Sequence, residues 1–127
     1  MNLDERIAAA ETKIFKVVLP NNTNHFDILF GGQAMQLMDE VAFITATRFS
    51  RKKVVTVSTD KIDFKQPIPA GTIIELTGKI VHLGNTSLKV EVEIVIEDMY
   101  SFAREKAITG TFTFVAIDED KRPVKIS

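Results

Sequence analysis

The stretch from Asn24 to Arg51 constrains the fold of this chain more than any other. A polar loop leads into the pair Gly31-Gly32, and the segment from Gln33 to Phe49 contains no proline and no further glycine. At about 100° per residue, most of a helix here is apolar, and its polar side chains fall on one narrow arc: Gln33, Gln36, Glu40 and Thr47. A helix with this pattern is buried, so the rest of the chain has to surround it.

One acidic residue interrupts the apolar surface of this helix. Asp39 lies about 60° beyond the edge of the polar arc, between Ala46 and Phe43, whereas Glu40 lies on the arc. A carboxylate on an apolar flank costs desolvation free energy unless it is paired or takes part in chemistry. Asp39 is therefore either a buried carboxylate that backbone donors satisfy or a functional group.

The remaining segments read as strands. A β-branched and aromatic run precedes the helix, and the segment Ser87–Glu97 shows the clearest alternation of apolar and polar residues. Turn signals separate the later strands, at Gln66–Gly71 and at Gly84-Asn85. The expected strands are Lys13–Leu19, Lys53–Phe64, Thr72–Leu83, Ser87–Glu97 and Arg104–Ile117. This order predicts an α+β fold in which about five antiparallel strands wrap one long central helix, with sheet edges that a second copy can cover.

Composition narrows the class of protein. The chain has 127 residues, so we expect a single domain over residues 1–127. There is no cysteine, and the two histidines form no ligand motif, so we expect no metal site. The net charge of −1 implies no general affinity for nucleic acid or for an anionic membrane. With no apolar run of about 18 residues and no signal-peptide pattern, a cytoplasmic location is expected.

Two motifs together resemble a known family. The first, N-x5-F-G-G-x5-M-D-E-x-A, begins at Asn24 and ends at Ala42; the second is VVTVSTDKIDFKQPIPAGT, from Val54 to Thr72. With the hairpin Gly84–Ser87 and the closing segment FTFVAIDEDKRPVKI, they resemble the hotdog-fold acyl-CoA thioesterases of the YciA and brain acyl-CoA hydrolase type. The resemblance covers nearly the whole chain from about Pro20 onward.

The resemblance implies a fold and an assembly. The helix would lie inside a hotdog sheet, and two copies would join their sheets into a homodimer with active sites at the interface. A trimer of dimers is common in the family. A loop Asn and a helix Asp from different subunits would serve the chemistry, and they map onto Asn24 and Asp39. Asp27 stands where relatives often have Gly, which affects the expected substrate range more than the reaction.

The implied reaction hydrolyses acyl-CoA to a fatty acid and coenzyme A, with no cofactor besides the coenzyme A of the substrate. Asp39 would act as general base or as nucleophile, and Asn24 would position water or the carbonyl, unless it only forms a turn. Gly31-Gly32 would expose helix N–H groups to the thioester oxygen, unless the pair only packs tightly. His25 and Glu40 read as solvated residues.

Further residues are expected to bind the coenzyme A part of the substrate. The resemblance places strand and hairpin polar residues along pantetheine, although each also fits an ordinary strand or turn: Ser58, Thr59, Asn85, Thr86 and Ser87. The basic residues Arg51, Lys52 and Lys53 are candidates for the coenzyme A phosphates, or they complement the helix dipole. Two alternative functions remain: a non-catalytic acyl-CoA-binding module, and a hotdog dehydratase acting on acyl-CoA or acyl carrier protein, for which only His25 is available.

Overall fold

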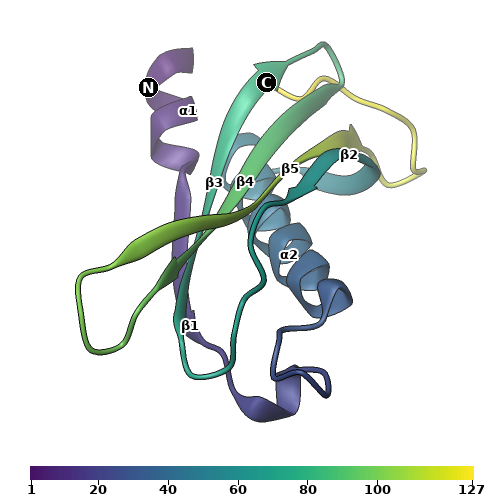
Figure 1. Cartoon of the computed structure of the whole chain (residues 1–127). Coiled ribbons are helices and arrows are strands. Elements are labelled where there is room, and N and C mark those ends of the chain that lie inside the picture. Colours follow the sequence, from purple (N-terminus) through teal and green to yellow (C-terminus); the bar gives the residue numbers. More distant parts are fainter.

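The computed structural model describes residues 1–127, and it places a long helix against one face of a curved antiparallel sheet (Figure 1). The chain order is α1 (Leu3–Ala10), β1 (Thr12–Val17), η1 (Pro20–Asn22), α2 (Gly31–Ser50), β2 (Lys53–Phe64), β3 (Ile73–Leu83), β4 (Ser87–Glu97) and β5 (Arg104–Ile117). The strand order in the sheet is β1-β3-β4-β5-β2, and every neighbouring pair is antiparallel. The predicted fold, one helix wrapped by five strands, is confirmed.

The predicted bounds of β2, β4 and β5 are confirmed to the residue, whereas β1 ends at Val17, two residues before the predicted end. A short helix, α1, precedes the first strand. A capping box starts α1: the Asn2 side chain accepts a hydrogen bond from the Glu5 N–H at 2.8 Å, and the Glu5 side chain reaches back to Asn2. Arg6 then ties α1 to α2, because its guanidinium lies 4.4 Å from the Phe49 ring centroid.

The core lies between α2 and the strand faces that alternate toward it. The apolar residues that alternate toward α2 along β3, β4 and β5 are buried: Ile74, Leu76, Ile80, Leu88, Val90, Val92, Ile94, Ile108, Phe112 and Phe114. Ile96, which the alternation in β4 also predicts on this face, is only half-buried. Gly78 lets α2 approach β3 closely, since a Cβ at this position would lie 2.5 Å from the Thr45 Oγ1. Since every strand of the sheet also contacts α2, the sheet fixes the position of the helix and of the groups that it carries.

The strand β2 is an edge strand that the single chain leaves uncovered. All residues from Val55 to Asp60 are exposed, including Val55 and Val57, although a strand ordinarily buries every second side chain. Its pairing with β5 shifts register between Thr56 and Ser58 and again between Asp60 and Asp63. An edge strand that is open on both faces and carries exposed valines is a surface that another chain can cover.

The outward side of α2 beside this edge carries a stripe of exposed residues: Gln36, Asp39, Glu40 and Phe43. The prediction that Asp39 lies on a buried flank is therefore wrong for the single chain. The reason is that β2 ends the sheet next to this side of α2, so no further strand covers it. Glu40 is exposed, as predicted.

The opposite face of the sheet holds an ion-pair network around Glu75. Burial raises the pKa of Glu75, but the hydrogen bond and charge of Arg104 and the charge of Lys13 outweigh it, so the pKa lies below its ordinary value. Since this carboxylate gains its partners on folding, the network stabilises the fold above the ordinary carboxyl pKa and loses that contribution on acidification. No helix in the structure combines the length and apolar character needed to cross a bilayer.

Candidate active site

The N-terminus of α2 presents unpaired hydrogen-bond donors. The N-cap residue, Phe30, contributes no side-chain hydrogen bond, and the first N–H bonded within the helix is that of Ala34, to the Phe30 carbonyl at 3.0 Å. The N–H groups of Gly31, Gly32 and Gln33 have no acceptor in the chain. Gly31 and Gly32 are also exposed, so a ligand oxygen can reach these donors at the positive end of the helix dipole.

The Asn24 side chain organises the loop that leads into α2. Its Oδ1 accepts hydrogen bonds from the N–H groups of Phe26 at 2.9 Å and Ile28 at 3.2 Å. Asn24 is thus a turn-forming residue, the alternative to its catalytic role that the sequence left open. The turn, however, uses only the side-chain oxygen, and the amide nitrogen donates no hydrogen bond within the chain. Asn24 can therefore support the turn and still donate to a ligand.

The same turn holds Asp27 in a conformation that favours glycine. Asp27 has a φ of 60°, which lies in the left-handed region that glycine adopts without steric cost. Asp and Asn are among the few other residues that tolerate this conformation. The Asp27 N–H donates to the Asn24 carbonyl at 3.0 Å, which closes the turn.

The carboxylate of Asp39 projects from the middle of α2 toward β2. The Thr56 hydroxyl donates a hydrogen bond to the Asp39 Oδ1 at 3.0 Å. This bond fixes one oxygen of the carboxylate and leaves Oδ2 without a partner in the chain. Sequence reasoning missed Thr56, because only the packing of β2 beside α2 brings the two residues together; the signal available was its place inside the second motif.

Asp39 and the free N–H groups of the same chain are too far apart to act on one carbonyl. Asp39 is eight residues beyond Gly31, which separates them by about 12 Å along the helix axis. Oxyanion donors and a general base each have to lie within roughly 3 Å of the reacting atoms. The structure thus places Asn24 in the loop that leads into α2 and Gly31-Gly32 at the start of the helix, and it leaves Asp39 about two turns farther along α2.

His25 has no carboxylate partner. It is exposed, as predicted, and its ring lies 4.0 Å from that of Phe26, centroid to centroid. The His–carboxylate pair that dehydratase chemistry requires is therefore not formed within the chain. No group of three or more His, Asp or Glu side chains is arranged to bind a metal ion.

The polar residues that we expect along pantetheine lie around strand β5. Ser58 and Thr59 pair with Thr113 and Phe112 of β5, and Ser87 pairs with Val115 on the other side of the same strand. The backbone carbonyls of Asn85 and Thr86 already accept hydrogen bonds, from the N–H groups of Ile126 and Ala116. The structure groups these five residues around β5, and their role in binding pantetheine stays a prediction.

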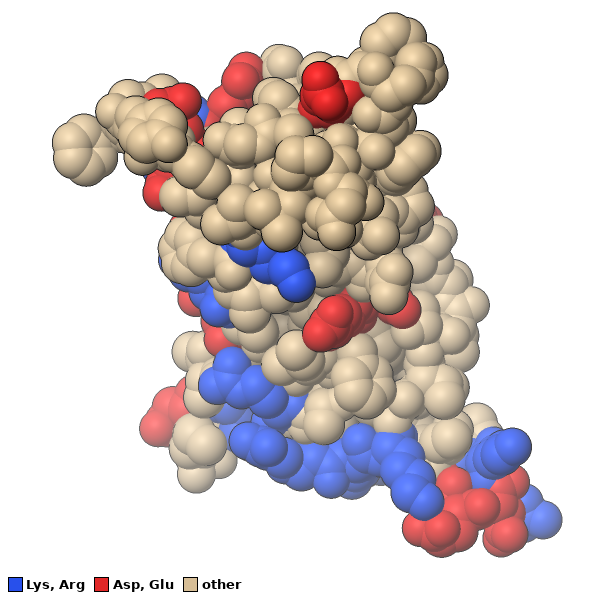
Figure 2. Space-filling model, turned by 90° about the horizontal axis from the view of Figure 1, so that it is seen from below, with Lys and Arg blue, Asp and Glu red and all other residues tan.

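Basic side chains gather along one edge of the molecular face seen from below (Figure 2). At the C-terminal end of α2, Arg51 ends the helix with a φ of 55°. Lys52 donates to the Lys125 carbonyl, and Lys53 pairs with Glu119 at 2.9 Å. These contacts favour a structural role for the two lysines. Because α2 has 20 residues, Arg51 lies about 30 Å from Gly31 of its own chain.

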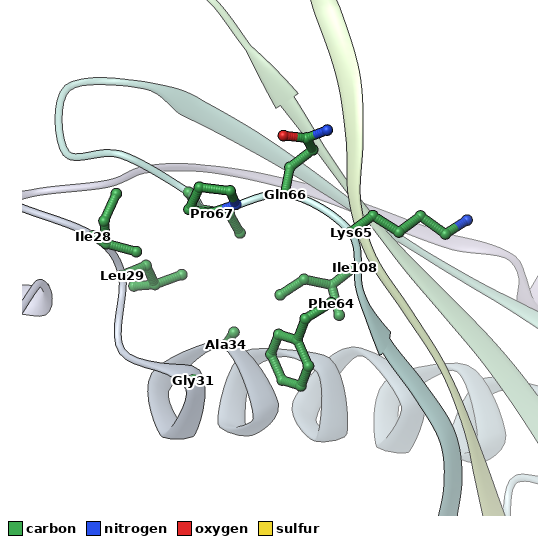
Figure 3. A pocket seen from close by; sticks show the side chains of 10 residues that line it. Ile28, Leu29, Gly31, Ala34, Phe64, Lys65, Gln66, Pro67 and Ile108 are labelled. Carbon is green, nitrogen blue, oxygen red and sulfur yellow. The ribbon is translucent and has the colours of Figure 1, made fainter.

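An apolar cavity of about 290 Å³ opens beside the N-terminus of α2 (Figure 3). It lies between the first turns of α2, the loop before the helix and the segment that follows β2; its apolar lining is formed by Ile28, Leu29, Ala34, Phe64, Ile68 and Ile108. Sequence reasoning did not find this cavity, because its walls come from three stretches that lie far apart in the chain, residues 28–34, residues 64–68 and Ile108. It adjoins the donors of Gly31.

The comparisons with known proteins agree with this geometry. Residues 26–103 match the family model described as the thioesterase superfamily. A curated relative from Zymomonas mobilis, named an uncharacterized acyl-CoA thioester hydrolase, is 39% identical over 98% of this chain and 84% of its own length.

Solved structures resemble the whole hotdog unit. An acyl-CoA hydrolase from Staphylococcus aureus, in complex with butyryl coenzyme A, coenzyme A and coenzyme A disulfide, superposes with a TM-score of 0.90 at 34% identity, over 94% of this chain and 73% of that one. An apo-hexameric acyl-CoA thioesterase gives 0.91 at 33% identity, over 94% and 77%. Alanine variants of the S. aureus protein at an aspartate, a threonine and an asparagine have also been solved.

Proposed function

Because the chain belongs to the thioesterase superfamily and is an acyl-CoA thioester hydrolase, we propose that two copies share each of its active sites. One copy supplies Asn24 and the N–H groups of Gly31 and Gly32, and the other supplies Asp39 with Thr56. Coenzyme A enters only as part of the substrate, and the reaction uses no cofactor. We also propose a cytoplasmic location, which the cytosolic acyl-CoA thioester hydrolases among its relatives support.

The observation that carries this proposal is the separation of about 12 Å along α2 between Asp39 and the free donors of the same chain. Each half is incomplete by itself: the helix N-terminus has donors but no base, and Asp39 has a positioned carboxylate but no oxyanion donors. The exposed stripe with Asp39 and Phe43 lies beside the uncovered edge strand β2. A second copy that covers this edge brings its own helix N-terminus toward Asp39.

In the proposed reaction, the thioester oxygen accepts hydrogen bonds from the N–H groups at the start of α2, where negative charge develops during attack. The free amide nitrogen of Asn24 donates to the carbonyl or to the attacking water. The Asp39 Oδ2 of the other subunit removes a proton from that water, while the Thr56 hydroxyl holds Oδ1. The acyl–sulfur bond breaks, and the thiol of coenzyme A leaves as a proton returns to it.

A likeness in residue type and spacing supports this assignment. Asn24, Asp39 and Thr56 are separated by the same numbers of residues as the asparagine, aspartate and threonine that were replaced by alanine in the S. aureus acyl-CoA hydrolase. A non-catalytic binding module would not require the Thr56–Asp39 contact, so we prefer the enzyme.

Self-association is the first consequence. We expect light scattering after size-exclusion chromatography to show a dimer or a multiple of it, because the edge strand β2, with Val55 and Val57 exposed, is uncovered in the single chain. The hexameric assembly of the structural neighbour makes a trimer of dimers the proposed larger form. A stable monomer that hydrolyses acyl-CoA would refute the shared site.

Thr56→Val is expected to lower kcat by roughly tenfold, with little change in KM, because it removes the hydrogen bond that orients the Asp39 carboxylate but keeps the side-chain shape. Thr111→Val is the matched control, since Thr111 lies on the neighbouring strand β5, outside the proposed site, and makes no side-chain hydrogen bond in the chain. Steady-state rates of coenzyme A release compare the two. If both substitutions lower kcat equally, Thr56 contributes to the structure of the strand and not to the orientation of Asp39.

A further inference from the structure

The apolar cavity beside the N-terminus of α2 has a shape that the hydrolysis mechanism alone does not require. Its inner wall is formed by fully buried side chains, those of Ala34, Ile68 and Ile108. Its outer wall is the Phe64 ring, which lies against the first turns of α2 while more than half of the residue is exposed (Figure 3). The cavity is thus closed at the core and bounded toward solvent by one aromatic side chain.

No charged group points into this cavity. Lys65 and Gln66 line its rim, but their side chains are directed away from the apolar residues (Figure 3). Their backbone is fixed, because both N–H groups donate to the Ala107 carbonyl, at 2.7 Å and 3.2 Å. A charged ligand group inside the cavity would lose its hydration without gaining a partner, which is unfavourable.

The cavity begins where the proposed reaction places the carbonyl. Gly31 both offers a free N–H and lines the cavity, and a Cβ at this residue would lie 3.9 Å from the Phe64 ring. A thioester held at these donors has two branches, and the coenzyme A branch is charged and has to lead to solvent. The uncharged acyl branch is the one that fits an apolar space.

We propose that this cavity holds the acyl chain and limits it to uncharged chains of short to medium length, with Phe64 and Ile28 as the residues that set the limit. This inference rests on the proposed function. Its volume of about 290 Å³ is about twice that of the ~150 Å³ engineered cavity that binds benzene, which leaves room for roughly ten carbon atoms. Longer chains have to displace the Phe64 ring or run out over the rim.

The test is a chain-length profile of kcat/KM with straight-chain acyl-CoAs from two to sixteen carbons. For the unmodified protein we expect a rise of up to about fourfold per added methylene, the value of burying one CH₂ group, and then a plateau or a fall near ten carbons. Succinyl-CoA, which carries a terminal carboxylate, should be hydrolysed at least about tenfold less efficiently than butyryl-CoA.

Two substitutions should move the profile in opposite directions. Phe64→Ala opens the outer wall, so it should raise kcat/KM for the sixteen-carbon acyl-CoA relative to the eight-carbon one by about tenfold. Ile28→Phe fills the cavity, so it should lower kcat/KM for the eight-carbon acyl-CoA relative to the four-carbon one by a similar factor. Phe102→Ala is the matched control, because Phe102 is fully exposed on the turn between β4 and β5. Inhibition by free coenzyme A should stay unchanged in all three, since it has no acyl chain.

The outcomes separate this inference from the proposed function. If the unmodified protein hydrolyses no acyl-CoA, the proposed function fails and this inference fails with it. If it is active but both cavity variants keep the profile of the unmodified protein, only the acyl cavity is refuted. A change in coenzyme A inhibition as large as the change in acyl-CoA efficiency would also refute it. Ile28→Phe decides the question alone if Phe64→Ala disturbs self-association, because Ile28 lies in the loop before α2.

Discussion

Asp39→Asn is expected to lower kcat for acyl-CoA hydrolysis by at least about 100-fold, the lower end of the contribution of a general base. The amide keeps the volume of the carboxylate and can still accept the hydrogen bond from Thr56, but it can neither remove a proton from water nor attack the carbonyl. Affinity for coenzyme A, measured by calorimetry, should survive. Stability should change little in the single chain, because Asp39 is exposed there.

Glu40→Gln is the matched control for this change. Glu40 is the next residue on α2, is also exposed, and makes no ion pair or side-chain hydrogen bond in the chain. It should keep wild-type turnover, so that a loss in Asp39→Asn reports the position of the carboxylate and not the net charge. Hydrolysis by Asp39→Asn at the wild-type rate would show that the catalytic assignment is wrong.

Mixing variants tests whether two subunits share the site. A heterodimer of one Asn24→Asp subunit and one Asp39→Asn subunit contains one site in which both side chains are intact. Random exchange at equal amounts should therefore restore about a quarter of wild-type activity, because half of the dimers are mixed and each has one of two sites restored. Two inactive variants that exchange subunits without any rescue would place the pair within one chain.

The second large effect is expected at Asn24. Replacing Asn24 by Asp should lower turnover by roughly 10- to 1000-fold, because a carboxylate cannot donate to the carbonyl or the water as the amide nitrogen does. The turn should be kept, since a carboxylate oxygen still accepts the N–H groups of Phe26 and Ile28. Turnover is measured as coenzyme A release and stability as the midpoint of urea unfolding.

Asn24→Ala serves as the comparison. It removes the donor and also both hydrogen bonds of the turn, so it should cost about 1–3 kcal/mol of unfolding free energy in addition to the loss of turnover. The expectation from sequence that a loop Asn contributes little to folding thus changes once its two contacts are seen. If Asn24→Asp has wild-type turnover, the residue only forms the turn.

Most of the fold could be predicted from local sequence patterns. The alternation in Ser87–Glu97 and the Pro and Gly turn signals placed β2, β4 and β5 at their observed bounds, because strand periodicity and turn chemistry depend on residues close in sequence. The capping box that starts α1, formed by Asn2 and Glu5, is likewise a local sequence pattern. Asp39 was first singled out by its place off the polar arc of the helix and then matched through the resemblance, whereas Asn24 was found through motif spacing and the resemblance alone.

By itself, then, the sequence determined one long helix inside an antiparallel sheet, the family and a short set of candidate residues, because periodicity, turns and motif spacing are local properties of the chain. Only the tertiary structure decided that Asp39 is exposed beside β2, that Thr56 orients it, and that an apolar cavity adjoins Gly31. Each of these depends on the strand order that puts β2 at the edge next to α2, and on register shifts in β2. Strand order and register join residues far apart in sequence, and such contacts leave no periodic trace in the chain.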